Sequence, residues 1–196
     1  MIFRILMFWV VLLGCQEIKG QTTIFSQNFE STTWTIPSTL SPAWTSEGTE
    51  NNQWHMNSFT TGWTSNSGGY SPTGANGTNQ SARFHTYDAP ENSTGSLISP
   101  IIDFSAYSGQ NKNLTFSMIN TDDTDTVDLF ISIDGGNSWG STLGTYGNYS
   151  NWTVINVNLG TIASSNVKIK FVATSDYGLT DIGIDEVTIK TGYFFN

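Results

Sequence analysis

The chain has 196 residues, with 16 acidic and 7 basic side chains that give a net charge of −9 and a sequence pI near 4.3. This length favours one domain, because an all-β sandwich of this size can bury a single sizeable core. A surface poor in Lys and Arg excludes the usual nucleic-acid partners, which need clustered cations to neutralise phosphates. Charged residues make up only 12% of the chain, and its Gly, Ser, Thr, Asn and aromatic content suits strands and turns better than helices.

Residues 1–20 are typical of a secretory signal peptide. One positive charge precedes an apolar run at Ile5–Leu13, which is too short to span a bilayer comfortably. A small residue at Gly20 fits ordinary cleavage before Gln21. Alternatively, Leu12–Cys15 resembles a lipobox, in which Cys15 would be acylated and would anchor the protein to a membrane. We expect a secreted, extracellular protein without a transmembrane helix, either free or attached to the cell surface.

Cysteine usage excludes disulfides from the mature domain, because Cys15 is the only cysteine. A secreted domain without disulfides commonly gains stability from a good core and a bound hard cation. The acidic composition makes calcium the cation to expect.

Alternating apolar and polar side chains predict several half-buried strands. Phe25 and Phe29 mark an opening strand. The later segments with this period are Ser96–Ile98, Asn113–Met118, Thr126–Asp134, Thr153–Leu159 and Val167–Ala173. Asp134–Asn137 predicts a hairpin turn, because its two glycines accept positive φ. Strands separated by Gly, Asn and Ser turns, with no helices between them, indicate an antiparallel β-sandwich.

Residues 57–80 interrupt this pattern. Gly, Ser, Thr and Asn dominate there, with Trp63 and Tyr70 interspersed. The segment is expected to be a long surface excursion, either a solvated loop that covers a sheet edge or a loop that contacts a ligand.

The last predicted strand contains a change of period. Its apolar positions are Ile182, Ile184, Val187 and Ile189, so the alternation slips by one at Asp185-Glu186. A β-bulge is the simplest cause. Adjacent carboxylates repel unless a cation or hydrogen-bond donors lie nearby, so one of the pair is a candidate metal ligand. The alternative is that both point to solvent.

Four motifs occur in a recognisable order: Phe29-Glu30, Asn51-Asn52-Gln53-Trp54, Leu97-Ile98-Ser99-Pro100 and Asp181–Val187. Together they resemble the MAM domain and its bacterial relatives, the cleaved-adhesin and choice-of-anchor jelly rolls of secreted surface proteins. The resemblance implies a concanavalin-like jelly roll over residues 22–192 and a structural calcium held by Glu30 and Asp185. Oxygens near Asn52 would supplement these carboxylates. Animal MAM domains carry disulfides, so their absence favours the bacterial branch.

Residues Ser132–Trp139 also fit the Asp-box pattern S-x-D-x-G-x-[ST]-W. The pattern recurs once per blade in sialidase-like propellers, whereas it occurs once here. We interpret it as a structural hairpin in which Asp134 accepts turn amides and Trp139 packs back on the sheet.

The sequence contains few residue patterns that are typical of catalytic sites. An acidic cluster comprises Asp122, Asp123, Asp125 and Asp128, but it lacks the glycine and the distal glutamate of an EF-hand, so a solvated loop is expected. The two histidines, His55 and His85, do not form a zinc-protease motif.

Two functional classes therefore remain. The first is a non-catalytic adhesion or carbohydrate-binding module whose exposed aromatic rings stack on sugars or on a cell-surface partner. The candidate rings are Trp63, Tyr70, Tyr146, Tyr149 and Trp152. The second is a small glycan-active enzyme using the acids of the 122–128 cluster; the lack of a catalytic motif favours binding. The chain is also compatible with an accessory domain of a larger surface protein or protease.

Overall fold

Eleven strands and two 3-10 turns form the described part of this computed structural model, which comprises residues 20–30, 44–48, 54–57, 74–86, 89–120, 124–176 and 181–192. The first sheet contains β1 (Thr23–Gln27), β3 (Trp54–Asn57), β4 (Ser81–Phe84), β6 (Lys112–Asn120), β9 (Tyr149–Gly160) and β11 (Ile182–Thr191). The second contains β2 (Thr45–Glu47), β5 (Thr94–Ile98), β7 (Thr126–Ser132), β8 (Gly144–Tyr146) and β10 (Lys168–Thr174). The 3-10 turns are η1 (Ala75–Gly77) and η2 (Ser105–Tyr107). This architecture confirms the predicted all-β antiparallel sandwich.

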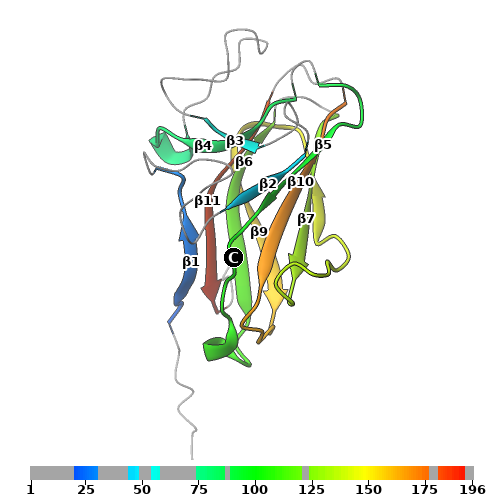
Figure 1. Ribbon diagram of the computed structural model, residues 1–196. Helices are drawn as coiled ribbons and strands as arrows, with labels where there is room; N and C mark the ends of the chain where they lie inside the picture. The colour runs from blue at the N-terminus through cyan, green and yellow to red at the C-terminus, as the bar shows by residue number, and fades with distance from the viewer. Residues whose placement is uncertain are drawn as a thin grey trace, which may run out of the picture.

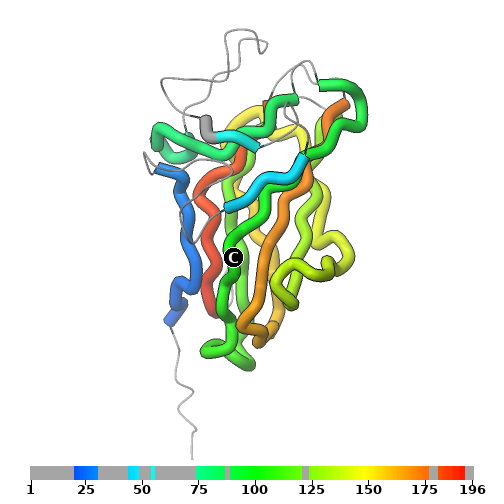
Figure 2. The backbone as a smooth tube through the Cα atoms, viewed as in Figure 1, coloured from blue at the N-terminus to red at the C-terminus, as the bar shows by residue number. Residues whose placement is uncertain are grey.

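The strand order brings distant parts of the chain together. The first sheet runs β3-β4-β11-β6-β9, and β1 pairs with β11 outside this path. β4 pairs with the beginning of β11, from Ile182 to Ile184, and β1 pairs with the end of β11, from Val187 onward. The second sheet runs β2-β5-β10-β7-β8. Figures 1 and 2 show β1 beside β11, so the first and last strands lie together on one side of the sandwich.

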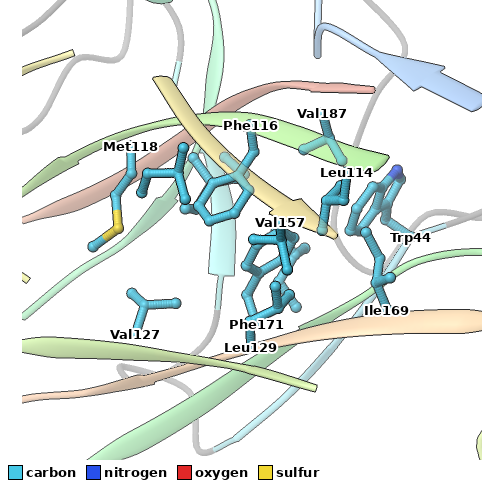
Figure 3. Close-up of a cluster of buried hydrophobic side chains, with 14 of the residues drawn as sticks. Trp44, Leu114, Phe116, Met118, Val127, Leu129, Val157, Ile169, Phe171 and Val187 are labelled. Carbon is cyan, nitrogen blue, oxygen red and sulfur yellow. The ribbon is translucent and has the colours of Figure 1, made fainter. Parts of the chain in front are cut away.

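The core lies between the two sheets. Phe116 of β6 meets Phe171 of β10 edge to face, with ring centroids 5.0 Å apart, and both side chains are buried. Leu114 and Met118 lie on the same inward face of β6, as the alternation predicted, and Figure 3 shows them in the same cluster as Phe171. Burying each of these large apolar side chains contributes about 1.5–3 kcal/mol.

Two details of the predicted strands were wrong. The opening strand ends at Gln27, and Phe29 lies beyond it at a positive φ of 55° while its ring is fully buried. The strand predicted over Thr126–Asp134 ends at Ser132, and Ile133, the last apolar position of its alternation, is 57% exposed. In both cases an apolar side chain continues the alternation after the backbone has left the sheet.

The glycine-rich turn after β7 forms as expected. Gly135 and Gly136 have φ values of +79° and +95°, which glycine adopts without a Cβ clash. The next paired strand is β8, which begins at Gly144, so residues 133–143 form a longer connection than a two-residue hairpin turn.

Several sequence predictions fall outside the described residues. These are the signal peptide and the lipobox with Cys15, together with Asn52, Trp63, Tyr70, Asp122 and Asp123. Within the described ranges, no helix is long and apolar enough to cross a membrane.

Candidate functional site

A bulge in β11 places two carboxylates in different surroundings. The pairing of β11 with β6 shifts register between Asp185 and Thr188, and Glu186 has a positive φ of 51°. The slip of period in the sequence therefore coincides with an irregularity in the pairing of β11, as predicted. Asp185 is fully buried, whereas Glu186 is only half-buried. The alternative that both carboxylates point to solvent was wrong for Asp185.

Asp185 holds the segment from Gly74 to Gln80, here called the 74–80 loop. Its Oδ2 accepts hydrogen bonds from the Ala75 amide at 2.7 Å and from the Thr78 hydroxyl at 3.1 Å. Its Oδ1 accepts from the Glu186 amide at 2.7 Å. Burial raises the pKa of Asp185 to about 7, and these hydrogen bonds oppose the rise.

Glu30 holds the same loop from the other end of the chain. One carboxylate oxygen, Oε1, accepts from the backbone amides of Asn79 at 2.7 Å and Gln80 at 2.6 Å. The turn through Phe29, just after β1, precedes this carboxylate. The two carboxylates expected to hold calcium therefore both bind one loop, although they come from opposite ends of the sequence.

The space beside Gly74 is surrounded by oxygen atoms. A Cβ built on Gly74 would lie 2.2 Å from Thr78 Oγ1, 2.4 Å from the Gln80 carbonyl oxygen and 2.9 Å from Asp185 Oδ2. The φ of Gly74 is −58°, which any residue adopts, so close approach and not backbone conformation requires glycine here. Hydroxyl, carbonyl and carboxylate oxygens are the ligands that calcium accepts.

The oxygens beside Gly74 come from one carboxylate, one hydroxyl and one backbone carbonyl. Among the described residues, no group of three or more His, Cys, Asp or Glu side chains lies together. A transition-metal site usually draws its ligands from such side chains. A calcium ion at the 74–80 loop would take carboxylate oxygens from Asp185 and Glu30, with neutral oxygens from Thr78 and Gln80 completing the set.

The predicted aromatic residues serve different purposes. Tyr146 is half-buried and packs edge-on against Phe116, with centroids 5.5 Å apart, and burial raises its pKa. Tyr149 also packs against the core. Tyr146 and Tyr149 thus help to cover the core, whereas Trp152 is a half-buried residue of β9.

The Asp-box segment has the contacts of a structural turn. Asp134 Oδ1 accepts from the Ser138 amide at 3.0 Å and from the Ser132 hydroxyl at 2.7 Å. Hydroxyl hydrogen bonds from these two serines hold the pKa of Asp134 well below its ordinary value. The Trp139 ring packs against the second sheet, with Lys170 Nζ 4.2 Å from its centroid. The geometry agrees with the structural interpretation.

The acidic cluster is not a solvated loop throughout. Asp125 is fully buried, and its Oδ1 accepts from the Asp176 amide at 2.7 Å. Asp128 lies on β7 and accepts a hydrogen bond from the Thr145 hydroxyl of β8. The expectation of solvation was wrong for Asp125, because an Asp that satisfies loop amides can be buried at a strand end.

One polar cluster was not anticipated from the sequence. His85 Nδ1 lies 2.7 Å from Asp181 Oδ1, which also accepts from the Thr86 amide at 3.1 Å. Arg83 lies 3.7 Å from the other oxygen of the same carboxylate. The cluster joins the end of β4 to the start of β11. His85 and Asp181 are 96 positions apart, so no local spacing could have identified them.

Solved structures share this arrangement of two sheets. The chain has the fold of the cleaved adhesin domains. The K3 cleaved adhesin domain of Lys-gingipain from Porphyromonas gingivalis matches with a TM-score of 0.61 and 17% identity, over 88% of this chain and 100% of that domain. The resemblance seen in the sequence to the cleaved-adhesin jelly rolls is therefore confirmed at the level of fold.

Two other neighbours have different activities. The carbohydrate-binding module TmCBM61, solved with β-1,4-galactotriose, matches with a TM-score of 0.52 and 12% identity, over 85% of this chain and 99% of the module. A cyclase from Fischerella sp. TAU matches with a TM-score of 0.59 and 11% identity, over 90% of this chain and 100% of the enzyme. No protein-family model and no curated protein matches the chain, so the MAM assignment stays a prediction.

Proposed function

We propose that the chain is a secreted, non-catalytic binding module of the adhesin type, which recognises carbohydrate or a cell-surface partner. The observation that carries the proposal is the shared fold: the sandwich matches cleaved adhesin domains and a carbohydrate-binding module along 85–88% of this chain. The apolar signal-like segment at residues 1–20 supports secretion, with acylation of Cys15 as the alternative route to the cell surface.

A structural calcium is part of the same proposal. Glu30 and Asp185 would hold the ion, with the Thr78 hydroxyl and the Gln80 carbonyl as neutral ligands. Bound calcium would connect the end of β1, the 74–80 loop and β11. Its binding free energy would stabilise the folded state. The position beside Gly74 supports this assignment, because oxygens of Asp185, Thr78 and Gln80 all lie within 3.0 Å of it.

The enzyme alternative has less support from the geometry. The enzyme hypothesis uses Asp125 as a catalytic acid. The Asp125 carboxylate is buried, however, and accepts a hydrogen bond from the Asp176 amide. Asp128 is engaged by Thr145 across two strands. A glycosidase needs two carboxylates that both face one bound sugar, and these two contacts do not provide that arrangement.

Glycan-array binding, followed by product analysis, tests the proposed function. The purified protein should bind at least one class of glycan and release no new reducing ends from it. Release of products would favour the enzyme alternative. Failure to bind any glycan or any cell surface would refute the binding function.

Calcium is tested separately by thermal melting with calcium and with excess chelator. The wild-type protein should melt at a higher temperature with calcium, and Asp185→Asn should lose this difference. Glu47→Gln is the matched control, because Glu47 is an exposed acid on β2 of the other sheet and should respond like the wild type. Equal melting of the wild type in both conditions would refute the calcium site.

A further inference from the structure

The outer face of the first sheet carries a row of uncharged polar side chains. Ser26 of β1 pairs with Thr188 of β11, Thr188 pairs with Thr115 of β6, and Thr115 pairs with Asn156 of β9. The Ser26 and Thr188 hydroxyls lie 3.4 Å apart, which shows that both face outward together. Because neighbouring strands are about 4.8 Å apart, the row presents a hydrogen-bonding group at each strand across four strands.

The middle of this row lies in an open hollow of about 200 Å³. Thr115, Ser117 and Thr188 line it, and all three have short side chains. Thr115 and Thr188 are half-buried and present hydroxyls that can take part in hydrogen bonds, although the Thr115 hydroxyl also donates to the Thr188 carbonyl at 3.5 Å. Ser117 is only 3% exposed and contributes little accessible surface. The hollow therefore offers a polar surface in which the small size of the side chains leaves space for a ligand.

Longer side chains border the hollow. Glu186 and Lys190 of β11 and Asn76 of the 74–80 loop contribute one carboxylate, one ammonium and one amide. Val154 of β9 contributes an apolar surface and is 58% exposed. Phe116 also lines the hollow, although its side chain is buried in the core. A sugar ring has hydroxyls at its edge and C–H groups on its faces, so hydroxyl and amide side chains beside an exposed valine can complement it.

Charge and apolarity argue against other occupants. The net charge of −9 disfavours a polyanionic chain. A protein partner usually buries a larger apolar centre than one valine. A neutral glycan carries no negative charge and does not need a large apolar centre on its partner.

From these observations we infer that this hollow binds a neutral, extended glycan chain. The chain would lie along the row formed by Ser26, Thr188, Thr115 and Asn156. The inference rests on the proposed binding function and specifies its site and its ligand class. The 74–80 loop links the hollow to the carboxylate pair: Asn76 borders the hollow, and its neighbour Ala75 is held by Asp185 at 2.7 Å.

Affinity electrophoresis with three neutral polysaccharides, β-1,4-galactan, β-1,4-xylan and β-1,4-glucan, tests the inference, with polygalacturonate as the anionic control. Thr115→Tyr fills the centre of the hollow and keeps a residue that favours strands. It should weaken retardation at least about tenfold, the scale of losing several ligand contacts together. Thr115→Val removes only the hydroxyl and should weaken binding roughly two- to twelvefold, as expected for one hydrogen bond.

Val172→Tyr is the matched control, because Val172 occupies the middle of β10 in the other sheet, between Ser96 and Asp128. It should bind like the wild type, and circular dichroism and melting should show that all variants fold. Unchanged retardation of Thr115→Tyr would overturn the inference while wild-type binding upheld the proposed function. Loss in Val172→Tyr alone would overturn it by placing the site on the second sheet. If none of the three polysaccharides retards the wild type, the inference also fails, whereas array binding to another glycan class would leave the proposed function standing.

Discussion

Gly74→Ala is the most direct perturbation of the oxygen-lined space at the 74–80 loop. The new methyl carbon would lie 2.4 Å from the Gln80 carbonyl oxygen and 2.2 Å from Thr78 Oγ1 unless the loop moved. Separations under 3.0 Å essentially never occur for a real Cβ, so these oxygens must be displaced. The variant should therefore lose calcium binding even though no ligand side chain has been removed.

The magnitude of each effect can be worked out in advance. Overpacking costs about 1–3 kcal/mol, which corresponds to a fall of roughly 2–12 °C in the melting temperature of a domain of this size. For the affinity typical of extracellular calcium modules, about 10 mM calcium would stabilise the wild type by about 1.4–2.7 kcal/mol. This equals roughly 3–11 °C. Differential scanning fluorimetry with calcium and with chelator resolves such shifts.

Gly77→Ala is the control within the same loop. Gly77 has a φ of +81° and no heavy atom within 4 Å of the position of a new Cβ. The substitution should cost about 1–2 kcal/mol of backbone strain, but it should keep the full calcium-dependent shift. The reasoning is refuted if Gly74→Ala gains as many degrees from calcium as the wild type does.

Phe116→Ala should lower the free energy of unfolding by about 3–5 kcal/mol, because it leaves a cavity beside Phe171; an unchanged urea midpoint would contradict this packing. Trp152→Ala should weaken glycan retention by roughly 1–3 kcal/mol in affinity electrophoresis, by analogy with base stacking on aromatic rings, whereas lost stability with unchanged binding would assign the ring to the core. Asp134→Asn should lower the melting temperature at neutral pH, because the hydroxyl of Ser138 favours the charged carboxylate. Since the folded pKa lies below the unfolded value, this stabilisation is present above the ordinary Asp pKa of 3.8 and is lost as the pH falls. The two proteins should therefore differ less in acid, and a constant difference down to about pH 2 would contradict the assignment.

Local periodicity was sufficient to predict seven of the eleven described strands and one irregularity, but it missed the short strands β2, β3, β4 and β8. Leu114, Phe116 and Met118 alternate with polar residues, and all three are buried on the inward face of β6. The slip at Asp185-Glu186 predicted the bulge, because a strand can restore its inward face after an extra residue only by breaking register. The same periodicity failed at Ile133, where apolar spacing continues although pairing has ended.

Only the tertiary structure decided which distant groups meet. Glu30 binds the amide of Asn79, 49 positions away, and Asp185 binds the amide of Ala75, 110 positions away. The family resemblance predicted that the two carboxylates act together. The sequence of the 74–80 loop, however, contains no pattern that predicts its contact with both of them. The row from Ser26 to Asn156 is likewise invisible in the sequence, because it exists only once four strands have aligned in register. Periodicity along a chain reports which side chains avoid water, whereas a binding surface depends on how the closed sandwich aligns strands that are distant in sequence.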